Sequence, residues 1–138
     1  VNVIVGQRLI RRLTESKERY FLSKDEFTTL AKTVDVARIL DFLKEENLVE
    51  KNAAWEQIPF WKPVPTGESE DGYAGRLGIH EVLKVTPAIK EIIIRGGTGD
   101  EIEAQARKEG MLTMLEDGIL QAVRGFTTIE EVLRVVTE

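Results

Sequence analysis

The chain has 138 residues, no cysteine and a single histidine, and its 19 Lys and Arg against 24 Asp and Glu give a net charge of −5. These counts exclude a thiol nucleophile, a disulfide and any cysteine-based metal site, and His80 alone cannot supply the imidazoles of a catalytic zinc site. The length suits one globular domain, and no window approaches the roughly 18 apolar residues of a membrane span. We expect an intracellular chain and, from its abrupt apolar start at Val1, a piece of a longer protein.

Charge is unevenly distributed along the chain. Residues 1–22 hold five basic and two acidic residues, a net of +3, whereas residues 98–138 hold nine acids and four bases, a net of −5. Either this difference reflects head-to-tail contact between subunits, or both segments are simply solvated surface. Because an acidic chain with a short basic cluster lacks the cationic surface that binds phosphates, no nucleic acid is expected as a partner.

Residues 23–57 are predicted to contain two helices. Ser23 and Glu26 form a capping box at the start of the first helix, and the second ends near Asn47. The apolar residues recur at helical spacing in two stripes, which are Phe27, Leu30 and Ala31, then Val36, Ile39, Leu40 and Leu43.

Residues 58–85 are predicted to be extended. The prolines near 59–65 remove backbone donors and hold the residues before them in extended conformations, and residues 66–72 form a polar turn. Residues 73–85 are rich in β-compatible side chains and interrupted by Gly75 and Gly78, which predicts one or two hairpin strands. A satellite core beneath this hairpin explains the local aromatic residues better than a base-stacking platform does: Trp55, Phe60, Trp61 and Tyr73.

Four short helices are predicted in residues 86–138. The first begins at Thr86-Pro87 and ends at Gly96-Gly97. Gly110 and Gly125 fall at later helix ends, where a positive φ is needed. The other three helices start at capping boxes, Thr98 with Glu101, Thr113 with Glu116, and Thr128 with Glu131. Their apolar faces predict a compact bundle. The fold class is therefore α+β, predominantly helical, with a small β-hairpin element and a C-terminal bundle of short helices.

No catalytic constellation emerges from the residues. A phosphate-binding Gly-x-x-x-x-Gly-Lys-Ser/Thr loop is missing from the sequence, so the chain is not a self-sufficient P-loop enzyme. Residues 96–99 are explained by a helix end followed by a helix start rather than by an anion site. Glu116-Asp117 has no obvious base or nucleophile as a partner. His80 and Glu81 are adjacent on a predicted strand and therefore face opposite sides.

Acidic and basic clusters leave two further possibilities. The acidic turn at 68–71 does not have the spacing of a calcium loop, which favours a solvated turn. Arg76 lies between small neighbours that allow close approach of a backbone or ligand, and its guanidinium suits either phosphate or carboxylate, or a structural ion pair. Arg8, with Gln7, Arg11 and Arg12, carries the same alternatives.

Several runs resemble, in order, the bacterial type II secretion and type IV pilus assembly ATPases. Residues 73–83, Tyr-Ala-Gly-Arg-Leu-Gly-Ile-His-Glu-Val-Leu, are similar to the family run Gly-Tyr-x-Gly-Arg-x-Gly-Ile-x-Glu-x-Leu. Residues 86–90, 109–118 and 124–135 look like the C-terminal region of the same family. Residues 2–13 resemble the segment that leaves its RecA-like core. The match covers about 1–13 and 72–137, and several motifs in register make it specific.

The resemblance implies a fragment of a hexameric ATPase that assembles pilins or pseudopilins at the inner membrane. It divides the chain into the tail of the RecA-like core at 1–22, a helical insertion at 23–57, a β-hairpin region at 58–85 and the helical bundle at 86–138. ATP and magnesium would bind in the full-length parent, with no cofactor in this fragment, which is not expected to be catalytic alone. Arg8 and Arg76 are expected near nucleotide or a neighbouring subunit.

The resemblance also implies the surroundings of this module. Its partners would be the parent's own ATPase core, the neighbouring subunits and the inner-membrane platform proteins of the secretion or pilus machine. The protein would be cytoplasmic and peripheral to the inner membrane through these partners. The competing interpretation is a winged-helix-like module that binds nucleic acid or protein, because two helices at 23–47 lead towards an extended hairpin. The acidic composition and the family motifs count against it.

The sequence departs from the family at a zinc site. Many members carry two cysteine pairs, and here Thr14 and Lys17 stand at the positions of the first pair and Pro65 and Glu68 at those of the second. No metal is therefore expected, and the Trp, Phe and Pro residues near 55–65 would hold this region by apolar burial instead.

We accordingly predict that exhaustive chelation leaves the melting temperature of the chain unchanged, because no folding free energy comes from a bound metal. Thermal unfolding followed by circular dichroism, with and without a strong chelator, measures this directly. A clear drop in melting temperature would show that a metal stabilises the fold.

Overall fold

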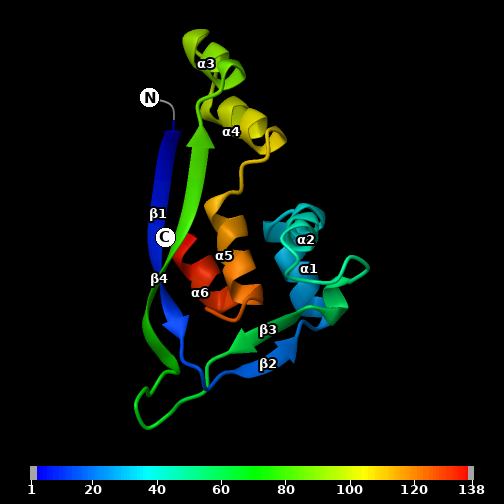
Figure 1. Cartoon of the computed structure of the whole chain (residues 1–138), viewed down its shortest axis with the longest axis vertical. Coiled ribbons are helices and arrows are strands. Elements are labelled where there is room, and N and C mark those ends of the chain that lie inside the picture. The colour runs from blue at the N-terminus through cyan, green and yellow to red at the C-terminus, as the bar shows by residue number, and fades with distance from the viewer. Residues whose placement is uncertain (1–2, 137–138) are drawn as a thin grey trace.

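The computed structural model describes residues 3–136 and confirms an α+β fold with a predominantly helical content. A long two-stranded ribbon runs along one side of the molecule, two helices pack against it, and a second, smaller sheet with its own helices lies beyond them (Figure 1). One helix pair sits at the far end of the ribbon (Figure 1). None of the helices within the described residues is long and apolar enough to cross a membrane.

The ribbon pairs β1 (Val3–Leu13) with β4 (Tyr73–Lys84) in antiparallel register. Local sequence does not predict that residues 3–13 form a strand, since the partner strand lies 60 or more residues away. Alternate residues of both strands, among them Ile10 and Ile79, point to the inner face and enter the core. The opposite, outer face of the ribbon is open to solvent at Val5, Leu9 and Val82.

The expected hairpin within 58–85 is wrong in its pairing. β3 (Pro59–Lys62) pairs with β2 (Glu18–Phe21), while β4 pairs with β1. Proline explains why β3 stays short, because Pro59 and Pro63 bracket it and neither can donate a backbone hydrogen bond. The long strand β4 instead finds in β1 a partner of matching length, and the predicted polar turn separates the two sheets.

Both helices predicted in 23–57 are present, as α1 (Lys24–Thr33) and α2 (Val36–Glu45). The capping box of Ser23 and Glu26 is formed in both directions. A short 3-10 helix, η1 (Trp55–Gln57), then places Trp55 in the core, where its ring stacks on Phe60 at a centroid distance of 6.2 Å. These two aromatic residues belong to the main core rather than to a satellite beneath a hairpin.

The four predicted C-terminal helices are α3 (Pro87–Ile94), α4 (Gly99–Lys108), α5 (Met114–Val123) and α6 (Ile129–Val136). They do not form one compact bundle. α3 and α4 pack together at the end of the ribbon, whereas α5 and α6 pack together on the ribbon and the core (Figure 1). The reason lies in their apolar faces, since α4 buries only Ala106 while α5 and α6 are buried along most of their length.

The threonine caps of the C-terminal helices are confirmed, but only one of the three reciprocal boxes closes. Thr113 and Glu116 satisfy each other's backbone amides. The hydroxyls of Thr98 and Thr128 accept from the expected amides, while Glu101 and Glu131 turn to arginines instead. A charged partner binds a carboxylate more strongly than a backbone amide does, so the ion pair is preferred. Gly110 and Gly125 have the predicted positive φ, at 100° and 87°.

The packing of α5 on α6 depends on a glycine, and we predict that Gly118→Ala lowers the free energy of unfolding by about 1–3 kcal/mol. A β-carbon at Gly118 would lie 2.4 Å from a methyl group of Val132, which is itself fully buried. Gly99→Ala is the matched control, because a β-carbon there meets nothing within 4 Å and alanine favours the helix. Urea unfolding of both variants measures the difference, and equal stability of the two would contradict the prediction.

Candidate functional site

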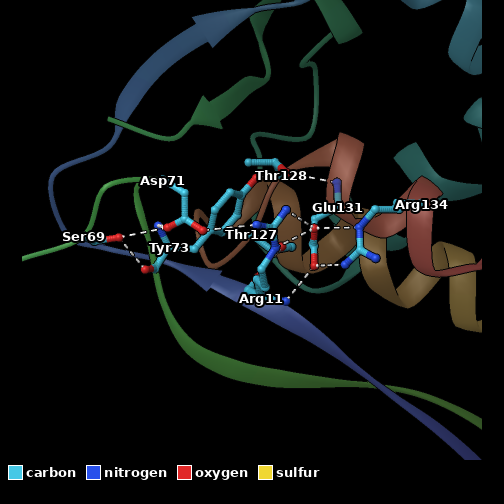
Figure 2. Close-up of polar contacts among 8 residues, drawn as sticks. All are labelled: Arg11, Ser69, Asp71, Tyr73, Thr127, Thr128, Glu131 and Arg134. Carbon is cyan, nitrogen blue, oxygen red and sulfur yellow. Dashed lines mark hydrogen bonds and ion pairs between the residues drawn. The ribbon is translucent and has the colours of Figure 1, made fainter. Parts of the chain in front are cut away.

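The most connected polar site in the described part of the chain is centred on Glu131, in the first turn of α6 (Figure 2). Its carboxylate is 1% exposed and lies between two arginines, Arg11 of β1 and Arg134 of α6 (Figure 2). Arg11 donates from Nε and Nη2 to Oε2 at 3.1 and 2.9 Å, and Arg134 donates from Nη2 to Oε1 at 2.7 Å. The two contacts from Arg11 to one carboxylate fix the approach of strand to helix.

Glu131 is held in its charged form. Burial by itself would raise the pKa of Glu131, but the hydrogen bonds from the Arg11 and Arg134 side chains and from the Arg11 backbone amide outweigh it and lower the pKa to about 2. The carboxylate therefore stays ionised at every pH at which the protein is expected to work. A carboxylate that stays charged and is hydrogen-bonded on both oxygens stabilises the fold, since it has no proton to exchange near neutral pH.

The site extends from Arg11 to the turn that precedes β4. Arg11 contacts Asp71 at 3.2 Å and lies 4.2 Å above the centroid of the Tyr73 ring. Asp71 in turn accepts from the Tyr73 amide and from Ser69, and these hydrogen bonds together with Arg11 lower the pKa of Asp71. The acidic turn is thus organised by hydrogen bonds, and the described residues contain no group of three or more His, Asp or Glu placed to hold a metal.

Side chains of the C-terminal helices also cap the edges of the ribbon. The outward-facing amide of Arg11 donates to Glu131 at 2.9 Å, and its carbonyl accepts from the Thr127 hydroxyl at 2.9 Å (Figure 2). On the other edge, the amide of His80 donates to Asp117 of α5 at 2.8 Å. Strand edges leave backbone groups unpaired, so these contacts close each edge where α5 and α6 cover it.

A second buried carboxylate, Glu116, fastens α2 to α5. Its side chain is 3% exposed, forms an ion pair with Arg38 and lies 3.6 Å from Arg107. Arg38 also donates to the carbonyls of Met111 and Arg107. The partners of Glu116 and Asp117 are arginines and a backbone amide of the ribbon, and none of these is a base or a nucleophile. The partners lie on other elements, where local sequence could not indicate them.

The structure does not bring Arg8 and Arg76 together. Arg8 lies on the inner face of β1 and donates to the carbonyl of Val135 at 3.1 Å, in the last turn of α6, where carbonyls lack a helical partner. Arg76 is exposed and stands opposite Arg11 in the ribbon register. Glu131 fits the local pattern of a capping box with Thr128, so this pattern does not single it out as a site residue. Arg134, three residues later, is a local signal of an ion pair, whereas nothing local points to Arg11.

Thr14 and Lys17, at which the resemblance implies a cysteine pair, make other contacts here. The amide of Thr14 donates to the carbonyl of Gly72 at 3.1 Å. Lys17 donates to the carbonyl of Gly125 at 2.7 Å, and its ammonium lies 5.1 Å from the centroid of the Trp61 ring. A cation held by a carbonyl and an aromatic face joins β3 to the loop between α5 and α6.

Taken together, the site consists of charged clamps that fix a ribbon to helices, with no nucleophile and base in contact among the described residues. These contacts hold the elements of the chain together, and comparison shows the family to which the chain belongs. The family model for type II/IV secretion system proteins matches residues 1–134, and the chain belongs to this family.

Individual relatives agree with this assignment. The type IV pilus assembly ATPase PilB of Pseudomonas aeruginosa is 36% identical over the whole of this chain, which covers 21% of the relative. The type II secretion system protein E of Xanthomonas campestris pv. campestris is 37% identical, again over the whole chain and 22% of the relative. PilB of Thermus thermophilus is 48% identical over 45% of this chain. The chain thus spans about a fifth of the length of the first two.

Proposed function

We propose that this chain is the C-terminal module of a hexameric motor ATPase that powers type IV pilus assembly or type II secretion. The support is its family and two relatives that match the whole chain, a pilus assembly ATPase and a type II secretion system protein E. In this proposal ATP and magnesium bind in the remainder of the parent. The module works in the cytoplasm at the inner membrane, beside the platform proteins of the machine.

One observation carries the mechanical part of the proposal, and it concerns the start of β1. Ile4 and Val5 point to opposite faces of the ribbon, yet their side chains are 51% and 59% exposed. An apolar strand segment open on both faces is typical of a strand that lies inside a larger sheet. We infer that the ATPase core of the parent covers this segment and that the module moves with the core as a rigid body.

The buried ion pairs of Glu131 and Glu116 support rigid-body movement. Glu131 and Arg11 join β1 to α6, and Glu116 and Arg38 join α2 to α5. A displacement of β1 should therefore move these helices with it. Arg8 lies within the clamped region and Arg76 on the outer face of the ribbon. In this proposal Arg76 reaches a neighbouring subunit or its nucleotide from the outer face of the ribbon, and Arg8 lies near a contact on the opposite face.

The test is Arg76→Gln in the full-length parent, for which we expect about tenfold lower ATPase activity or loss of ring assembly, as for an arginine at the centre of an interface. ATP turnover and size by light scattering measure the two effects. Arg19→Gln is the control, since Arg19 is an exposed arginine on β2 whose guanidinium lies only against Phe21. Normal activity and normal rings in Arg76→Gln would leave this residue with a structural role only.

A further inference from the structure

An apolar groove lies between α1, β2 and α6, on a side of the molecule separate from the ribbon. Its volume is about 290 Å³. This lies at the lower limit of roughly 300–1,000 Å³ typical of small-molecule pockets, so it has room for a few side chains rather than for a cofactor. The floor is formed by aliphatic residues of α1, α6 and the link between β2 and α1, and by one aromatic ring of β2: Leu22, Leu30, Ile129, Leu133 and Tyr20.

The rim of this groove is acidic. Asp25 and Glu26 come from the first turn of α1 and Glu130 from the first turn of α6, and no Lys or Arg is among the described residues that line the groove. Glu26 accepts the Ser23 amide within its capping box. No hydrogen bond or ion pair joins the carboxylates of Asp25 and Glu130 to other side chains within residues 3–136. Three carboxylates therefore surround the apolar floor, against one nearby cation, Lys62, whose ammonium lies 5.4 Å from the centroid of the Tyr20 ring.

The carboxylates of the rim also affect Tyr20, which lies at the floor of the groove. Burial, and then the charges of Glu26 and Glu130, raise the pKa of Tyr20 to about 12. The phenol accordingly remains protonated and neutral at neutral pH. The groove thus offers apolar contact in its centre and three negative charges at its edge.

We propose that this groove docks a segment of a partner protein that presents apolar side chains flanked by Lys or Arg. Charge complementarity selects this occupant. An uncharged apolar ligand would gain nothing from the exposed carboxylates, an anion would be repelled, and a simple cation would leave the apolar floor uncovered. Only a ligand with both properties satisfies the floor and the rim, which is how an amphipathic segment lies in a groove.

The proposal is tested with a probe of this chemistry. A fluorescently labelled amphipathic peptide of Leu and Lys is titrated with the chain, beside a twin peptide in which Glu replaces Lys, and binding is followed by fluorescence anisotropy. We expect the Lys peptide to bind, the Glu peptide not to bind, and added salt to weaken the complex. Sedimentation of the chain alone shows whether a second copy occupies the groove.

Two variants of the chain locate the binding. Asp25→Asn with Glu130→Gln removes two rim charges and is expected to weaken binding about fivefold, as for two rim ion pairs. Asp100→Asn with Glu103→Gln removes two exposed charges from α4, at the far end of the molecule (Figure 1), and is expected to leave binding unchanged. Thr29→Trp places an indole over the groove from the exposed side of α1 and is expected to abolish binding.

Circular dichroism shows that each variant is folded before its affinity is compared. Equal weakening by the α4 control would mean that the peptide responds only to net charge, and unchanged binding to Thr29→Trp would place it outside the groove. Either result would overturn the proposal, as would equal binding of the Glu peptide. Self-association that is lost in Thr29→Trp would identify the occupant as a second copy and would overturn the assignment to a basic partner segment.

Discussion

Glu131→Gln is expected to lower the free energy of unfolding by about 2–3 kcal/mol, since it breaks a buried carboxylate's contacts with two arginines and a backbone amide. The loss is at the lower end of what buried pairs show, because Arg11 and Arg134 are 44% and 50% exposed and regain water. Urea unfolding followed by circular dichroism measures the change. Glu130→Gln changes the exposed carboxylate one residue earlier, and its free energy of unfolding should stay within about 0.5 kcal/mol of that of the unsubstituted chain.

The same residue sets the acid sensitivity of the fold. The pKa of Glu131 falls from the model-compound value of 4.5 to about 2 on folding, so its contribution is fully present above pH 4.5 and is lost as the pH falls towards 2. A shift of this size corresponds to roughly 3 kcal/mol. The unfolding free energies of the unsubstituted chain and of Glu131→Gln should therefore converge as the pH falls from 4.5 to 2. A constant difference across this range would contradict the assignment.

A comparable loss, about 3 kcal/mol, is expected for Arg38→Met, which keeps the aliphatic stem but removes the guanidinium. Glu116 would remain buried with Arg107 at 3.6 Å as its charged neighbour, and the carbonyl of Met111 would lose its donor. Lys32→Met, on the exposed side of α1, is the matched control and should have little effect. Urea unfolding compares the two.

A double variant separates the charge from the packing at this clamp. Arg38→Met with Glu116→Leu removes both members of the pair and replaces the carboxylate by an apolar side chain, so part of the lost stability should return. Because Glu116→Leu also removes the bond to the Thr113 amide, a double variant less stable than Arg38→Met alone would mean that the stranded carboxylate costs less than this cap contributes.

The elements that the sequence predicted correctly are those whose signals are local. The caps at Ser23 and Thr113, and the glycines at 110 and 125, act within one helical turn, and all are found where they were expected. The β1 strand was not predicted, because its start is apolar on both faces and its second half is basic, which matches neither an alternating strand nor a helix. Its identity depends on β4, far along the chain.

The site escaped prediction for a similar physical reason. Glu131 satisfies the local pattern of a capping box with Thr128, but the arginine that takes its carboxylate lies 120 residues earlier. Glu116 fulfils its predicted cap and also binds Arg38, so one carboxylate has both a local and a distant role. Sequence spacing can identify the first role only, because tertiary pairing decides the second. Arg8 and Arg76, singled out by their neighbours, lie on opposite faces of the ribbon.

The carboxylates of Glu131 and Asp117, at the two edges of the ribbon, also constrain how the two strands align. If β1 slipped by one residue against β4, the amide of Arg11 would turn inward, Glu131 would face a position without an outward N–H, and Ile10 would leave the core. Asp117 applies the same constraint to β4 through His80. Two residues on helices thus fix the alignment of a strand pair to which they do not belong, and in a slipped ribbon both carboxylates would lose their strand amides.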